Sequence, residues 1–193
     1  LLYCVAHTLT GRYVSEFRKN DRTIQYETGL IILSVLEYFF CFSEVRTVSV
    51  IQFAKLWKNH PYPKSPCDRA HFPNQCAIRM GVALEETGID TSTFDQKYPN
   101  RRCYPGFKHS PRHILAAQEL ANWISVNPNI FGNKELIKDQ REKSLIGRRG
   151  IIFIRNGWGS TDHIDVWDGE HMKGGAPDWI NLGDEVWFWE IKQ

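Results

Sequence analysis

The most informative stretch of the chain covers residues 74–84 and begins Asn74-Gln75-Cys76-Ala77-Ile78-Arg79-Met80. Apolar side chains recur at positions 77, 80 and 84 and at 78 and 82, which is the spacing of a helix with a broad buried face. We expect Asn74 to be the N-cap and Gly88 to end the helix. Cys76 would then lie in the first helical turn.

Around this helix the sequence predicts more helices and then strands. A short helix is expected at about 48–57, a long loop over 90–111, and a second amphipathic helix after Pro111 that ends near residue 127. Three strands are expected at 150–154, 163–167 and 185–191, where apolar runs are bounded by turn residues. Helices followed by an antiparallel meander indicate an α+β fold.

The composition indicates a folded domain. A chain of 193 residues with 13% aromatic residues fits one domain or one domain plus an appendage and excludes intrinsic disorder. The net charge of +2 gives no electrostatic case for nucleic-acid binding. No window reaches the roughly 18 apolar residues of a membrane span, so we expect no span. The best apolar stretch, residues 30–42, follows about thirty mixed residues and not a short basic run, so we expect no cleaved signal peptide.

Two compositional parts divide the chain at about residue 45. Residues 45–193 are expected to form the domain. Residues 1–44 are expected to be an N-terminal extension, which is either an extra helix or a segment that is not native to the domain.

Cys76 is the first candidate for a chemical role. A thiol in the first turn of a helix feels the positive end of the helix dipole, which lowers its pKa and favours the nucleophilic thiolate. A cysteine nucleophile needs a base, and His163 at the start of an expected strand is the best-placed histidine. The alternatives are a cysteine that is merely buried in the core and a surface histidine beside a turn.

Three aspartates are candidates for orienting the imidazole of His163. Asp165 shares its face of the strand, although side chains at i and i+2 usually stand side by side rather than end-on. Asp168 precedes Gly169 and is explained as a turn residue. Asp178 could face the ring from a neighbouring strand or loop.

A competing interpretation is a zinc site. Cys67, His71, Cys76 and Cys103 have suitable ligand chemistry. The sequence has no C-x-x-C pair, however, and Cys103 stands alone in its loop. We therefore expect no metal and no cofactor.

Two blocks of sequence resemble a known family, the type VI secretion amidase effectors of family four. The first block is residues 74–80, preceded by the runs 53–57 and 62–63, and the second is residues 163–169, followed by 186–189. The similarity covers about residues 48–191. It implies a papain-like fold of the NlpC type, with N-terminal helices packed on an antiparallel sheet.

The resemblance also implies a function. Members of this family cut peptidoglycan stem peptides between D-glutamate and the diamino acid. A type VI apparatus delivers them into the periplasm of a rival bacterium, and a cognate immunity protein holds them in check. The alternative from the same fold is a catalytically degenerate binding module that an immunity or secretion partner recognises.

Site residues follow from the same resemblance. Cys76 would be the nucleophile and His163 the base, and the family's third residue is an aspartate past the histidine strand. Asp178 fits that role best and Asp168 second. The backbone N–H of Cys76 and the side chain of Gln75 would hold the oxyanion, with Asp165 and Asp168 as further candidates for substrate support.

Overall fold

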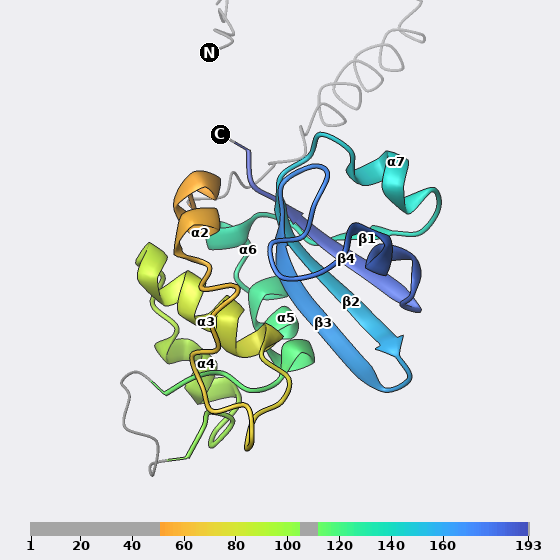
Figure 1. Ribbon diagram of the computed structural model, residues 1–193. Helices are drawn as coiled ribbons and strands as arrows, with labels where there is room; N and C mark the ends of the chain where they lie inside the picture. The colour runs from red at the N-terminus through yellow and green to blue at the C-terminus, as the bar shows by residue number, and fades with distance from the viewer. Residues whose placement is uncertain (1–50, 105–111, 193) are drawn as a thin grey trace, which may run out of the picture. The chain divides into compact units, whose positions relative to one another are not determined.

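The computed structural model describes residues 51–104 and 112–192 (Figure 1). Five helices come first along the described chain: α2 (Phe53–Asn59), α3 (Cys76–Thr87), α4 (Ser92–Lys97), α5 (Ala117–Ser125) and α6 (Pro128–Phe131). The remaining elements are β1 (Glu135–Ile137), α7 (Arg141–Leu145), β2 (Gly150–Trp158), β3 (Thr161–Trp167), the 3-10 helix η1 (Pro177–Asn181) and β4 (Glu185–Glu190). The expectation for residues 1–44 lies outside the described residues.

The four strands form one antiparallel sheet in the order β1-β4-β2-β3. The α+β class is therefore confirmed, but the expected meander is wrong. After β3 the chain passes through η1 and returns to the other edge of β2, so that β4 pairs with β2, with Ile152 opposite Phe188. The histidine strand β3 is left at one edge of the sheet.

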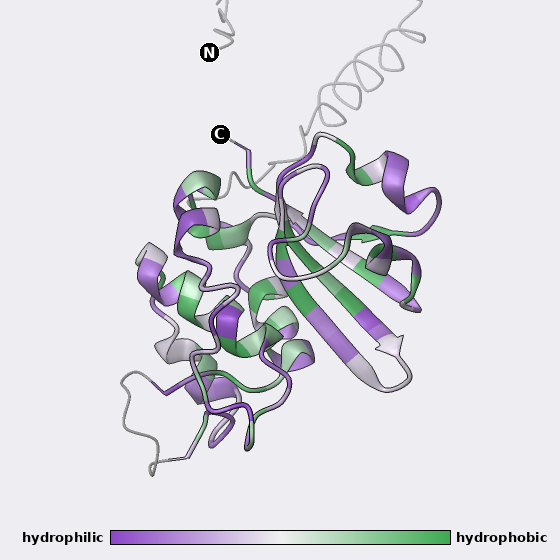
Figure 2. Cartoon of the chain, viewed as in Figure 1, coloured by the Kyte–Doolittle hydropathy of each residue, from purple (hydrophilic) through white to green (hydrophobic). Residues whose placement is uncertain are grey.

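Both faces of the sheet are buried, because alternate residues of the strands enter two different cores. Ile151 and Phe153 of β2 join the larger core with the apolar faces of α2, α3 and α5. Ile152 and Ile154 enter a smaller core on the opposite face. Hydrophobic residues accordingly run through the middle of the sheet, while the turn between β2 and β3 is more polar (Figure 2).

Helix α3 largely follows its sequence pattern. Ala77, Met80 and Leu84 are buried in the larger core. The helix ends at Gly88, as predicted, because this residue has a positive φ of 96° and its N–H caps the carbonyls of Leu84 and Glu85. The expected N-cap was one residue off, since Gln75 and not Asn74 precedes the first helical residue.

Residues 90–104 and 112–116 differ from the expected loop and early helix, and residues 105–111 of that loop lie outside the described residues. Residues 92–97 form α4, and α5 begins only at Ala117. The residues before α5 are extended instead, because Ile114 pairs with Arg102 in an antiparallel bridge and Cys103 N–H donates to the carbonyl of His113. Within the described ranges, none of the helices has the length and apolar character needed to cross a membrane.

Candidate active site

Cys76 and His163 meet where the helical layer touches the edge of the sheet. Helix α3 packs on β3, and Cys76 is its first residue. The Cys76 thiol shares a hydrogen bond with His163, and its Sγ lies 3.8 Å from the carbonyl oxygen of Asp162. Two residues chosen from the sequence are thus brought together by the fold.

The electrostatics of this pair favour a charged thiolate and imidazolium. Burial alone would raise the pKa of the Cys76 thiol, but the hydrogen bond and charge of His163 outweigh it and lower the pKa. Burial alone would lower the pKa of His163, but Asp165 and then Cys76 raise it to about 9. Each partner therefore stabilises the ionised form of the other.

Asp165 is the carboxylate beside His163. Its Oδ2 lies 3.2 Å from Nε2 of His163 and accepts the N–H of Gly174 at 2.8 Å. Its Oδ1 accepts the N–H of Val166 at 2.7 Å and lies 3.5 Å from Nε2 of His60. Three hydrogen bonds and the nearby Nε2 of His60 thus surround this carboxylate. The expectation that an i+2 side chain would not meet the imidazole end-on was wrong.

The other two candidate aspartates lie elsewhere. Asp178 is exposed in η1, and it is its neighbour Trp179 whose ring packs on His163. Asp168 accepts the N–H groups of Glu170 and His171 with Oδ1, which is the turn role that its position before Gly169 predicts. The geometry therefore gives the place beside His163 to Asp165, which corrects the preference for Asp178 and then Asp168.

Gln75 is placed for a structural role. Its Nε2 donates to the carbonyls of Phe72 and Cys67, at 2.6 and 3.2 Å, so the side-chain donors hold the preceding loop. Its buried Oε1 has no hydrogen-bond partner among the described residues. The expectation that Gln75 donates to an oxyanion finds no support here. The backbone N–H of Cys76, at the N-terminus of α3, is in the position that this role requires.

His60 is a site residue that the sequence did not reveal. Burial is the largest influence on this imidazole, and although Asp165 acts in the opposite sense, the pKa falls to about 4. The ring is therefore neutral near pH 7. Its Nδ1 faces the N–H of Tyr62 at 3.5 Å, so the ring proton lies on Nε2, toward Asp165. No short motif signals this role, because residues 60 and 165 meet only in the folded chain.

Aromatic rings cover the other side of His163. The indole of Trp179 meets the imidazole edge-on at 5.1 Å between centroids, and the exposed Trp158 packs on Trp179 at 4.7 Å. Gly175 allows this arrangement, since a Cβ there would lie 2.8 Å from the Trp179 ring and 3.3 Å from Nε2 of His163. The two indole rings shield the His163–Asp165 pair from water on that side.

A second cysteine–histidine pair has different chemistry. Sγ of Cys67 lies 3.0 Å from Nδ1 of His113, but both residues are buried. Burial and the neighbouring Cys103 raise the pKa of Cys67 to about 12, whereas the pKa of Cys76 is lowered. A nucleophile must be a thiolate that substrate can reach. Cys76 meets that requirement and Cys67 does not.

A cavity of about 820 Å³ lies away from this pair. It is lined by residues of α2, of the segments 147–149 and 168–170, and of the C-terminal end of β4. Neither Cys76 nor His163 contributes to its wall. The reactive groups, and not the cavity, therefore locate the candidate active site.

Comparison with solved structures gives the same fold. Tae4 from Enterobacter cloacae superposes with a TM-score of 0.58 at 16% identity, covering 76% of this chain and 99% of that one. The Tae4–Tai4 effector–immunity complex from Enterobacter cloacae gives a TM-score of 0.54 at 18% identity, covering 74% and 99%. Tae4 from Salmonella typhimurium, in complex with the Enterobacter cloacae immunity protein Tai4, gives 0.52 at 17% identity, covering 74% and 99%. The papain-like expectation for the fold is consistent with these neighbours.

Comparison of the sequence itself identifies the family. None of the curated proteins matches the chain. The family model described as type VI secretion system (T6SS), amidase effector protein 4, matches residues 72–189, which is more than half of the chain and includes Cys76, His163 and Asp165. The resemblance seen in two short motifs thus extends through the helices and the sheet, and this chain belongs to the Tae4 family of type VI secretion amidase effectors.

Proposed function

We propose that this amidase effector hydrolyses the amide bond between D-glutamate and diaminopimelate in peptidoglycan stem peptides, with Cys76 as the nucleophile. The observation that carries the proposal is the continuous hydrogen-bonded series Cys76, His163, Asp165 at the junction of helix and sheet. A thiolate beside an imidazolium that a carboxylate orients is suited to acyl transfer. Membership of the amidase effector family supports the same reaction class.

The reaction has two halves. In the first, the Cys76 thiolate attacks the γ-D-glutamyl carbonyl, and the backbone N–H of Cys76 stabilises the oxyanion that forms. The C–N bond then breaks, and His163 gives its proton to the departing amine of the diamino acid. In the second half, His163 takes a proton from water. The resulting hydroxide attacks the thioester, the C–S bond breaks, and the Cys76 thiolate and the D-glutamyl carboxylic acid are released, after which the acid gives its proton to solvent.

Asp165 and His60 act through His163 rather than on the substrate. The carboxylate of Asp165 holds Nε2 of His163, which leaves Nδ1 for the thiol. His60 and the N–H of Gly174 hold the carboxylate in turn. Because separate segments hold the two carboxylate oxygens of Asp165, the imidazole keeps its orientation through both halves of the reaction.

The place of action and the partner are part of the proposal. Delivery by a type VI apparatus into a target bacterium, with action on the wall in the periplasm, follows from the effector family and from the substrate. Tae4 proteins of Enterobacter cloacae and Salmonella typhimurium form complexes with the immunity protein Tai4. We propose a partner of the same class for this chain, held in the cell that makes the toxin.

The alternative of a degenerate binding module would be favoured by loss of the reactive groups. The described residues retain a thiol whose pKa is lowered and an imidazole whose pKa is raised, in hydrogen-bond contact. A module that only binds has no need of this pairing. The observation therefore favours the enzyme.

Digestion of purified Gram-negative peptidoglycan, followed by mass analysis of the fragments, tests the proposal. The wild-type protein should release fragments cut between D-glutamate and diaminopimelate, and Cys76→Ala should release none while keeping the melting temperature of the wild type. Turnover by Cys76→Ala would remove the nucleophile assignment. Absence of cleavage by well-folded wild-type protein would favour the binding module.

A further inference from the structure

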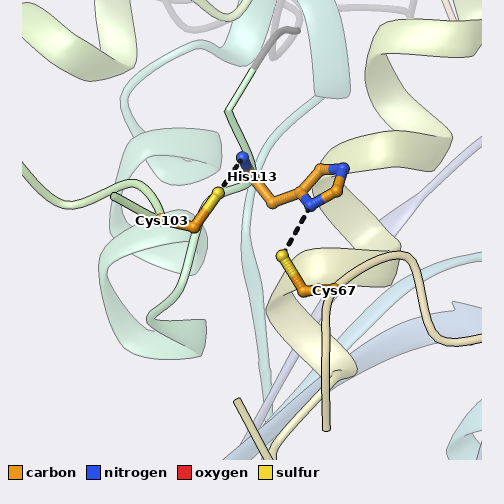
Figure 3. A group of neighbouring side chains, drawn as sticks. All are labelled: Cys67, Cys103 and His113. Atoms are coloured by element: carbon orange, nitrogen blue, oxygen red, sulfur yellow. Dashed lines mark hydrogen bonds between the residues drawn. The ribbon is translucent and has the colours of Figure 1, made fainter. Parts of the chain in front are cut away.

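Three metal-binding side chains converge outside the catalytic centre: Cys67, Cys103 and His113 (Figure 3). Each offers one ligand atom, and these atoms all lie within 4.8 Å of one another. The residues are 4%, 0% and 8% exposed, so the cluster is buried. Thiolate sulfur and imidazole nitrogen are the ligands that Zn²⁺ prefers in structural sites.

Two of the three ligands are held against each other by the backbone. The N–H of Cys103 donates to the carbonyl of His113 at 3.0 Å, and the N–H of His113 donates to Sγ of Cys103 at 3.2 Å. The adjacent residues Arg102 and Ile114 form an antiparallel bridge. Cys103 and His113 are therefore positioned by the chain and not by the side chains alone.

Cys67 comes to the same point from the loop before α3. Its Sγ lies 3.0 Å from Nδ1 of His113, and its carbonyl accepts Nε2 of Gln75 at 3.2 Å. Gln75 directly precedes Cys76. An ion bound here would thus fasten the loop that leads to the nucleophile onto residues 101–104 and 112–115.

The spacing of the ligand atoms suits one small ion. Bonds of about 2.3 Å to sulfur and about 2.0 Å to nitrogen place the ligands of a tetrahedral Zn²⁺ about 3.5–3.8 Å apart. The observed separations extend from 3.0 Å to at most 4.8 Å, so movements of about 1 Å reach that geometry. Phe72, Ile78 and Leu115 pack in the same cluster as the two cysteines.

We propose that Cys67, Cys103 and His113 form a structural Zn²⁺ site that locks the loop in front of the nucleophile helix. The described residues supply three ligands, and the fourth tetrahedral position is left to water or another donor. On binding, the Cys67 and Cys103 thiols release their protons to solvent as the two sulfur–metal bonds form. The positive charge of the bound ion favours the thiolate form of both cysteines.

These three ligands differ from the four zinc candidates that the sequence offered. His71 is exposed and pairs with Asp68, and Cys76 pairs with His163, so neither joins the cluster. His113 replaces them. Spacing failed to identify it because His113 approaches Cys103 through strand-like pairing and not through a local motif. Buried cysteines often serve only as small apolar residues. Cysteines that only fill apolar space need no imidazole nitrogen beside them, whereas Nδ1 of His113 lies 3.0 Å from Sγ of Cys67.

The test uses the full chain, reduced and stripped of metal, with Co²⁺ as the spectroscopic probe and Zn²⁺ as its competitor. We expect one equivalent of Co²⁺ to produce thiolate-to-cobalt charge-transfer absorption, which Zn²⁺ then abolishes. Cys67→Ser and Cys103→Ser should each weaken metal binding by more than about 100-fold, because changes in the outer shell alone weaken it by about 10- to 100-fold. Cys76→Ser is the matched control and should bind the probe like the wild type.

Two further readouts remain informative even where a serine variant does not fold. In the wild type, Zn²⁺ should raise the melting temperature and Mg²⁺ should not. Zn²⁺ should also protect Cys67 and Cys103, but not Cys76, from alkylation. Absence of charge-transfer absorption in the wild type would overturn the proposal, as would its loss in Cys76→Ser. A Cys67–Cys103 disulfide in metal-free protein isolated without reductant would overturn it in favour of a redox link.

Discussion

At the scale of single residues, Asp165 is the position where the structure changes the expected chemistry most. Asp165→Asn would present an amide in place of a carboxylate to Nε2 of His163 and to the N–H of Gly174. We expect kcat to fall by about 10²- to 10⁴-fold, because the imidazole loses its orientation and its charge stabilisation. Kinetics on a defined muropeptide provide the measurement.

Asp178→Asn, at an exposed carboxylate, is the control and should keep full activity. The reverse pattern would restore Asp178 as the third residue.

The pH dependence of activity is set by the same residues. The reactive form needs a Cys76 thiolate, whose pKa is lowered, and a His163 imidazolium, whose pKa is raised to about 9. We expect kcat/KM to rise from acid pH as the thiol ionises and to fall above about pH 9 as His163 loses its proton. Asp165→Asn removes a group that raises the pKa of His163, so the alkaline limb should move to lower pH. An alkaline limb that stays in place would mean that His163 is not the group that limits activity there.

At the scale of elements, helix α3 allows a matched pair of glycine substitutions. Gly88 ends the helix with a φ of 96°, where an added Cβ meets nothing nearer than Lys55 Nζ at 3.9 Å, so any penalty comes from the backbone. Gly81 lies inside the helix, and its Cβ would make ordinary contact with Ile114 at 3.5 Å. We expect Gly88→Ala to destabilise the protein by about 1 kcal/mol and Gly81→Ala to stabilise it by about 0.5–1 kcal/mol.

Urea denaturation of both glycine variants provides the measurement. The same chemical change should move the midpoint in opposite directions. Loss of stability in Gly81→Ala would show that the contact with Ile114 is already too tight. An unchanged Gly88→Ala would show that the end of the helix is not fixed at that residue.

The elements also show which parts of the fold a sequence pattern can predict. Helix α3 extends over 12 residues and buries one face, so its periodicity identified it and Gly88 marked its end. Strand β1 has three residues and α7 has five, which is too short for a period. Both depend on contacts made in the folded state: β1 pairs with β4, and Arg141 of α7 donates to the carbonyls of Ile180, Gly183 and Asp184.

The same distinction applies to the site. The position of Cys76 at the start of a helix is a local property, and the sequence predicts it. The position of His163 in a strand is also local, because the apolar run that it begins predicts that strand. His60, Gly174 and His113 depend on which segments meet, and no local pattern carries that information. Asp165 lies in the second sequence block, but the general rule on i+2 side chains disfavours it, and that rule does not allow for an imidazole long enough to reach its neighbour.

At the scale of the whole molecule, Arg102 ties three segments together. Its guanidinium pairs with Glu85 of α3 and Asp95 of α4, at 2.8 and 2.7 Å, and donates to the carbonyls of Thr91 and Arg112. Its side chain is 7% exposed. Arg102→Ala leaves Glu85 without its buried partner, and we expect the free energy of unfolding to fall by about 3–5 kcal/mol.

The neighbouring arginine is the matched control for this prediction. Arg101 pairs with Glu119, but its side chain is 53% exposed. Arg101→Ala should therefore change the free energy of unfolding by less than about 1 kcal/mol. Chemical denaturation of the two variants in one buffer makes the comparison. Equal losses would mean that burial does not strengthen the Arg102 network.

The order of the catalytic groups along the chain also has a consequence for how the protein is made. The thiol belongs to the first half of the described chain, whereas its base and the carboxylate that orients the base emerge from the ribosome much later. A nascent chain, or a fragment that stops before β3, carries the sulfur without the groups that ionise it. Truncated translation products and amino-terminal proteolytic fragments that end before β3 should therefore have no amidase activity in the cell that synthesises them.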